Sequence, residues 1–192
     1  MKAMSVRRLV VVLATVSLAA VTAAGDEKTC PGAPSMTVET ACRNASGTQA
    51  MYDMCKDALG GVPDPLSDHD VTVYALAAEN SALASVGATQ DAAIKLLLYN
   101  SSLSGEEKDA YMECVEAYTT AEHAIGNVLD KLGVCSLDGL GDDYMNGLLD
   151  LESCRDRVLK LPVSLLYAIV LVDRKKAALA LAFFLGKLLG IP

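Results

Sequence analysis

Six cysteines constrain what this chain can fold into more than any other feature of its sequence. All six follow an apolar leader, at Cys30, Cys42, Cys55, Cys114, Cys135 and Cys154. In an oxidising compartment, six cysteines suggest three disulfides, although spacing alone leaves many pairings open. Zinc binding is the alternative, but the chain has no CxxC motif and only two histidines, His69 and His123. We therefore expect disulfides, no metal site and no cofactor.

The N-terminal leader supplies the oxidising compartment. Residues 1–8 include Lys2, Arg7 and Arg8 and no acid, and the uncharged run at 9–24 ends in small residues. A basic start, a short apolar run and a small-residue ending are typical of a secretory signal peptide. The alternative is an uncleaved anchor, but the run is short for a membrane span. We predict a signal peptide at residues 1–24 and a secreted mature domain at residues 25–192.

Removal of the leader makes the chain more acidic. The full chain has 16 basic and 24 acidic residues and a net charge of −8; three of the basic residues lie in the leader. The mature chain therefore has a net charge of about −11, which argues against nucleic acid as a partner because its binders need clustered positive charge. The acidic balance favours a basic partner.

The composition and the spacing of apolar residues favour helices. The sequence is 52% hydrophobic but only 5% aromatic, and its Ala and Leu are strong helix formers. Two short helices are expected at residues 36–43 and 48–59, and together they would make a helical hairpin. A bridge between Cys42 and Cys55 would clamp this hairpin, whose arms are too short to be stable alone.

Four longer helices are expected after a Gly- and Pro-rich hinge at residues 60–66. The first spans about 70–100, with Ser67 or Asp68 as its N-cap. The second starts at a Ser104–Glu107 capping box and ends at Gly133. The third spans about 142–159 and the fourth about 163–189. The sequence thus predicts an all-α protein: an antiparallel, up-down-up-down four-helix bundle at 67–190, preceded by the hairpin at 36–59, stapled by disulfides and without strands.

The apolar tail at residues 161–191 raises the question of a membrane span or a lipid-anchor signal. A span needs an uninterrupted apolar run, but the charged residues 173–176 divide the tail and Lys187 lies near its end. We therefore expect a largely buried bundle helix and no membrane contact after signal cleavage.

The sequence offers no convincing catalytic residues. Neither histidine has a nucleophile at a recognised local spacing, and the acid pairs at 106–107 and 142–143 open helices, where acids stabilise the helix dipole. We therefore expect a protein that is not an enzyme. Two sequons make Asn44 and Asn100 candidates for glycosylation.

Several segments resemble the plant invertase inhibitors and pectin methylesterase inhibitors. They are TAC at 40–42, CKDAL at 55–59, YMEC at 111–114, DLESC at 150–154 and SLLY at 164–167. The resemblance covers about residues 30–189 and implies the bridges Cys42–Cys55 and Cys114–Cys154. Cys30 and Cys135 are additional to the family's four cysteines; they could pair with each other, or remain as free or intermolecularly linked thiols.

The resemblance also implies a function: inhibition of a larger cell-wall enzyme by covering its active-site cleft. It places the protein in the apoplast or cell wall, with the vacuole as an alternative. The family's invertase inhibitors use a Pro-Lys-Phe segment that the corresponding residues 139–146 (GLGDDYMN) lack. Pectin methylesterase is therefore favoured over invertase as the target. The rival class is a secreted structural or storage protein, and the sequence leaves the oligomeric state open.

Five residues are candidates for contact with the target. Asp142, Asp143 and Tyr144 lie next to the region that relatives use, and Glu113 and Glu116 lie on the second long helix. These acids would attract a cationic enzyme. The alternative is that Asp142 and Asp143 only stabilise the helix start and that the other acids are solvated surface.

Overall fold

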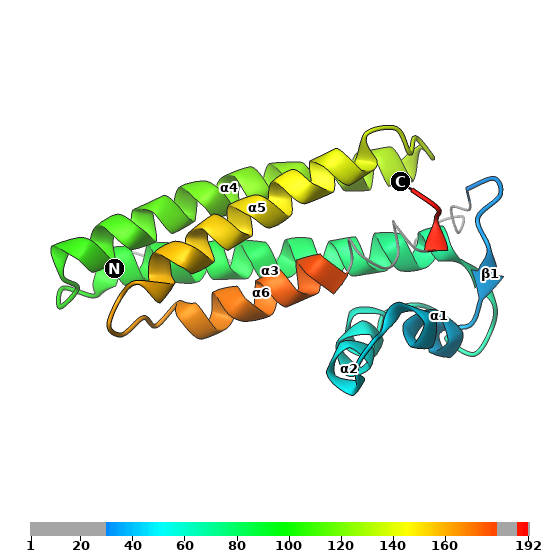
Figure 1. Cartoon of the computed structure of the whole chain (residues 1–192), viewed down its shortest axis with the longest axis horizontal. Coiled ribbons are helices and arrows are strands. Elements are labelled where there is room, and N and C mark those ends of the chain that lie inside the picture. Colours follow the sequence, from blue (N-terminus) through cyan, green and yellow to red (C-terminus); the bar gives the residue numbers. More distant parts are fainter. Residues whose placement is uncertain (1–29, 180–187, 192) are drawn as a thin grey trace, which may run out of the picture.

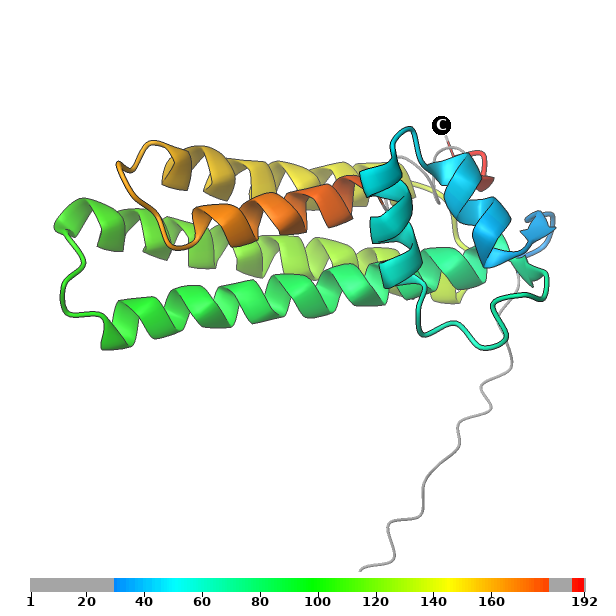
Figure 2. The same ribbon diagram turned by 90° about the horizontal axis from the view of Figure 1, so that it is seen from below.

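The computed structural model describes residues 30–179 and 188–191. The predicted signal peptide lies outside these residues, as does most of the C-terminal part of the expected fourth bundle helix. Within the described residues the chain is all-α, with four helices side by side along the long axis and a helical hairpin at one end (Figures 1 and 2). This is the architecture that the sequence predicts.

The hairpin consists of α1 (Val38–Ala45) and α2 (Gln49–Ala58), each capped by a threonine. Thr37 Oγ1 accepts the Thr40 amide at 3.2 Å, and Thr48 Oγ1 accepts the Met51 amide at 3.3 Å. The Cys42–Cys55 disulfide joins the two helices in the buried interior of the hairpin. Caps and bridge together stabilise helices that would not persist alone in water.

A two-stranded antiparallel ladder joins the hairpin to the bundle, where no strand was predicted. It pairs β1 (Ser35–Met36) with β2 (His69–Asp70). Met36 is therefore in a strand, so α1 starts two residues later than expected. The two strands lie more than 30 residues apart in the sequence, so no local sequence pattern predicts that they pair.

The first bundle helix, α3 (Val71–Tyr99), begins after this ladder, and its N-cap is Asp70 in place of the predicted Ser67 or Asp68. Asp70 Oδ1 accepts the Thr72 amide at 2.7 Å. The two predicted caps lie in the loop before β2, where the Ser67 amide donates a hydrogen bond to the Asp64 carbonyl at 3.0 Å.

The second and third bundle helices, α4 (Gly105–Gly133) and α5 (Leu140–Leu159), pack against each other along their lengths. The predicted capping box at Ser104 and Glu107 is present. The two helices approach closely at Gly147, where an added Cβ would lie 3.2 Å from the Ala124 Cβ. The helix α5 starts two residues before the predicted start, after Gly139, whose φ of +66° suits glycine.

The last described helix, α6 (Tyr167–Leu179), starts four residues later than predicted. Turns and bends around Pro162, within residues 161–166, delay the helix. It packs between α5 and α3 and closes the bundle (Figure 2).

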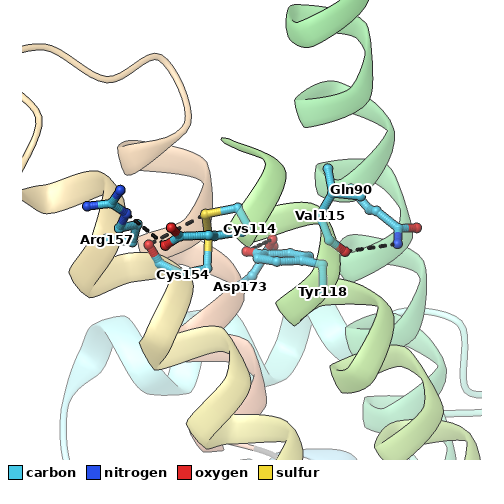
Figure 3. Close-up of a disulfide and its surroundings, with 8 residues drawn as sticks. Gln90, Cys114, Val115, Tyr118, Cys154, Arg157 and Asp173 are labelled. Carbon is cyan, nitrogen blue, oxygen red and sulfur yellow. Dashed lines mark hydrogen bonds and ion pairs between the residues drawn. A yellow bond between two sulfur atoms is a disulfide. The ribbon is translucent and has the colours of Figure 1, made fainter. Parts of the chain in front are cut away.

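Two further disulfides fasten the bundle. Cys114–Cys154 connects α4 to α5 (Figure 3), and Cys30–Cys135 connects the N-terminal segment to the loop between those helices. All six cysteines are therefore in bridges. Two of the pairs are those implied by the family resemblance, and the third joins the two additional cysteines.

Candidate functional site

The charged residues that were predicted to contact a target lie on α4 and α5, which pack against each other. Two ion pairs cross between the helices: Glu113 Oε2 lies 2.7 Å from Arg157 Nε, and Lys131 Nζ lies 2.5 Å from Asp143 Oδ2. Both pairs are partly exposed, so each contributes little to stability. Glu113 and Asp143 are therefore engaged in ion pairs within the molecule.

These candidate residues do not form a single patch. At 1.5 Å per residue, Glu113 and Lys131 are about 27 Å apart along α4. Glu116 lies one helical turn from Glu113, whereas Asp142 and Asp143 lie near Lys131 at the other end of the face. Glu116 and Asp142 are exposed and have no ion pair among the described residues.

Tyr144 was wrongly predicted to be available to a partner. Only 4% of it is exposed, and it lies in the core opposite Glu79 of α3, itself 1% exposed. The sequence contained the signal for burial, because Tyr144 shares an apolar helix face with Leu151 and Val158. Desolvation by burial raises the pKa of Glu79 to about 8 and raises the pKa of Tyr144.

A second buried carboxyl group, Asp173 of α6, accepts hydrogen bonds from two neighbouring helices. Its Oδ1 accepts a hydrogen bond from the Ser85 hydroxyl at 2.6 Å. Its Oδ2 accepts one from the Tyr118 hydroxyl at 3.0 Å (Figure 3). Lys176 Nζ donates to Ser85 Oγ at 3.0 Å. The network joins α3, α4 and α6. It fixes α6 in the bundle because any shift of this helix would leave a buried polar group without a hydrogen-bond partner.

The prediction from the sequence considered residues 173–176 only as charges that interrupt an apolar run. The signal for a buried aspartate was present, since Asp173 falls on the buried face of α6 at helical spacing from Leu166, Val170 and Ala177. A carboxylate at such a position requires hydrogen-bond partners on the neighbouring helices.

The outer face of α6 is apolar and exposed, which corrects the expectation of a largely buried helix. Leu165, Ile169 and Val172 are exposed to 58%, 41% and 45%. Ile169 and Val172 lie three residues apart on one face of the helix, and Leu165 lies in the turn just before it. We call these three residues the α6 stripe. Contiguous apolar surface of this kind marks an interaction site more often than isolated apolar residues do.

The two histidines lie in different settings. His69 is buried in the ladder, and its Nε2 lies 2.9 Å from the Asp64 carbonyl oxygen. His123 is exposed on α4. Within residues 30–179 and 188–191, no three His, Cys, Asp or Glu side chains are grouped as metal ligands would be. No helix in the same described part is both long and apolar enough to cross a membrane.

The fold and its bridges define a class of protein, the disulfide-bonded four-helix bundle with an N-terminal helical hairpin. The same fold occurs in a crystal structure of a mutant form of a pectin methylesterase inhibitor from Arabidopsis, with a TM-score of 0.62 and 17% identity over 77% of this chain and 94% of that chain. A pectin methylesterase inhibitor from Arabidopsis thaliana matches with a TM-score of 0.58 and 15% identity over 79% of this chain and 95% of that chain. No protein-family model and no curated protein sequence matches the chain.

Proposed function

We propose that the protein is a secreted inhibitor of a pectin methylesterase and acts by covering the enzyme's active-site cleft. The observation that supports this most strongly is the likeness to two pectin methylesterase inhibitors over 94% and 95% of their own chains. A rigid bundle suits this role because a preorganised surface loses little conformational entropy on binding.

The proposal includes export to the apoplast or cell wall, with the vacuole as the alternative destination. Three disulfides support it, because such bridges persist in oxidising compartments. The two sequon asparagines are placed differently: Asn44 is exposed near the end of α1, whereas Asn100 is half-buried at the C-cap of α3. We expect glycosylation at Asn44 more readily than at Asn100.

The α4–α5 face is the proposed contact surface for the enzyme. Glu116 and Asp142 are exposed and unpaired among the described residues, and Glu113 and Asp143 could exchange their internal ion pairs for pairs with the enzyme. Tyr144 is excluded because it is buried. Charges on such a rim mainly govern the association rate and its dependence on salt.

Charge neutralisation tests this surface. We expect the variant Glu116→Gln/Asp142→Asn to bind pectin methylesterase more slowly at low salt, by about three- to tenfold, and to lose part of the parent's salt dependence. Surface plasmon resonance at several salt concentrations measures both effects. A variant with the parent's association rate and salt slope would show that these acids lie outside the interface.

Parallel titrations test the target. We expect the mature protein to inhibit pectin methylesterase and to leave invertase active. The region before α5 lacks the Pro-Lys-Phe segment of the family's invertase inhibitors. Inhibition of invertase alone would reassign the target. Loss of neither activity at micromolar protein would support a structural or storage role.

A further inference from the structure

A cleft of about 500 Å³ separates the hairpin from the bundle. Its apolar lining comes from Ala50, Met54 and Ala58 of α2 and from Val172 of α6. Val172 also belongs to the α6 stripe, so exposed apolar side chains continue beyond the cleft at Ile169 on α6 and at Leu165 in the turn before it.

The charges around the cleft are arranged asymmetrically. Asp53 and Asp57 lie four residues apart on the α2 rim, and both are exposed. Asp53 accepts a hydrogen bond from Gln49, and neither aspartate has an ion pair among the described residues. On the opposite wall the only charged residue is Lys176, whose ammonium group donates to Ser85. A cationic ligand group is therefore attracted to the α2 rim and repelled from the α6 wall.

The cleft lies away from the α4–α5 face. In Figure 1 the hairpin lies beside α3 and α6, and α4 and α5 lie on the other side of the bundle. One rigid partner that covers the α4–α5 face would leave this cleft open. The cleft is therefore a second surface, independent of the proposed contact with the enzyme.

We propose that this cleft binds a protein segment that places one large apolar side chain between α2 and α6 and a neighbouring Lys or Arg against Asp53 and Asp57. The apolar lining gives the segment affinity, and the acidic rim sets its charge and orientation. The overall acidity of the chain, at a net charge of −8, attracts the same kind of segment and disfavours an anionic lipid surface.

A tryptophan peptide provides a direct probe, because the protein itself contains no Trp. The probe is the peptide acetyl-Gly-Lys-Trp-Lys-Gly-amide. The control peptide has the same sequence with Glu at both Lys positions. We expect a saturable blue shift of the Trp fluorescence for the Lys peptide, with a dissociation constant of about 0.1–1 mM. The Glu peptide should not bind.

Paired variants locate the binding site. We expect Asp53→Asn/Asp57→Asn and Val172→Ser each to weaken binding of the Lys peptide about three- to tenfold. The matched control, Asp91→Asn/Asp109→Asn, removes the same net charge at exposed positions outside the cleft and should bind as the parent does. Circular dichroism melts verify that every variant is folded.

Three results would overturn the proposal. The first is absence of binding, or equal weakening by the cleft and control charge variants. The second is a dimer in sedimentation velocity that Val172→Ser dissociates, since a second copy would then occupy the surface. The third is binding to vesicles of phosphatidylcholine and phosphatidylserine that the same variant abolishes. None of these measurements uses the enzyme, so failure here is distinguishable from failure of the proposed inhibition.

Discussion

Glu79 and Asp173 are both buried carboxyl groups, but Asp173 has more hydrogen-bond partners than Glu79. The hydroxyl groups of Ser85 on α3 and Tyr118 on α4 both donate to Asp173, whereas Glu79 faces the Tyr144 hydroxyl, whose hydrogen bond lowers the carboxyl pKa less than burial raises it. Desolvation therefore dominates at Glu79, and the side chain is most stable there when it is protonated.

The first prediction concerns Glu79 and pH. Its pKa is about 8 in the folded protein, against an ordinary value of 4.5. Between these values the folded state holds a proton that the unfolded state releases, so stability falls as pH rises from about 4.5 to about 8. We expect a loss on the order of 3–5 kcal/mol across this window. Denaturant titrations of the parent protein at pH 5 and pH 8 measure it.

Glu79→Gln keeps the shape of the side chain and removes the titration. We expect this variant to be nearly as stable at pH 8 as at pH 5, whereas Glu106→Gln, at an exposed position, should keep the parent's pH dependence. If Glu79→Gln and the parent lose stability equally over this range, Glu79 is not the group responsible.

The second prediction concerns the Asp173 network. Asp173→Ala leaves the hydroxyl groups of Ser85 and Tyr118 without their acceptor, and we expect it to cost about 2–4 kcal/mol. Tyr118→Phe removes one donor and should cost about 1–2 kcal/mol. A double-mutant cycle by urea unfolding measures the coupling between the two residues. Additive effects would contradict a direct interaction.

At the scale of the helices, local signals in the sequence predicted more than long-range ones. The Ser104 capping box, the end of α4 at Gly133 and the presence of two hairpin helices follow from neighbouring residues and were predicted correctly. The start of α1 and the N-cap of α3 were wrong because the ladder between β1 and β2 determines them. Burial of Tyr144 and Asp173 could have been predicted from helical spacing, whereas the α2–α6 cleft depends on how the hairpin packs.

The third prediction concerns the hairpin. The Cys42–Cys55 bridge closes a short loop with a sequence separation of 13 residues, and in the loop-entropy model such a bridge contributes about 3 kcal/mol. We expect Cys42→Ala/Cys55→Ala to unfold α1 and α2 locally while the bundle stays folded. Hydrogen exchange would show this as lost protection in residues 38–58 alone. Lost protection throughout the chain would mean that the hairpin and the bundle fold as one unit.

At the scale of the whole molecule, the fold and the proposed activity rest on different kinds of support. Helical periodicity, turn residues and cysteine positions predicted the bundle and the hairpin, and the structure has both. The target enzyme and its contact surface depend on exposed side chains, whose identity the fold does not determine. For this reason Glu116 and Asp142 are proposals, whereas the bundle itself is an observation.

Steady-state kinetics of a pectin methylesterase, at several pectin concentrations with and without the mature protein, test the central claim most directly. If the bundle covers the active-site cleft, inhibitor and pectin exclude each other. The apparent KM should then rise with inhibitor concentration, kcat should stay unchanged, and saturating pectin should restore full activity. Unchanged kinetics at micromolar protein, or a lowered kcat at constant KM, would contradict inhibition by occlusion.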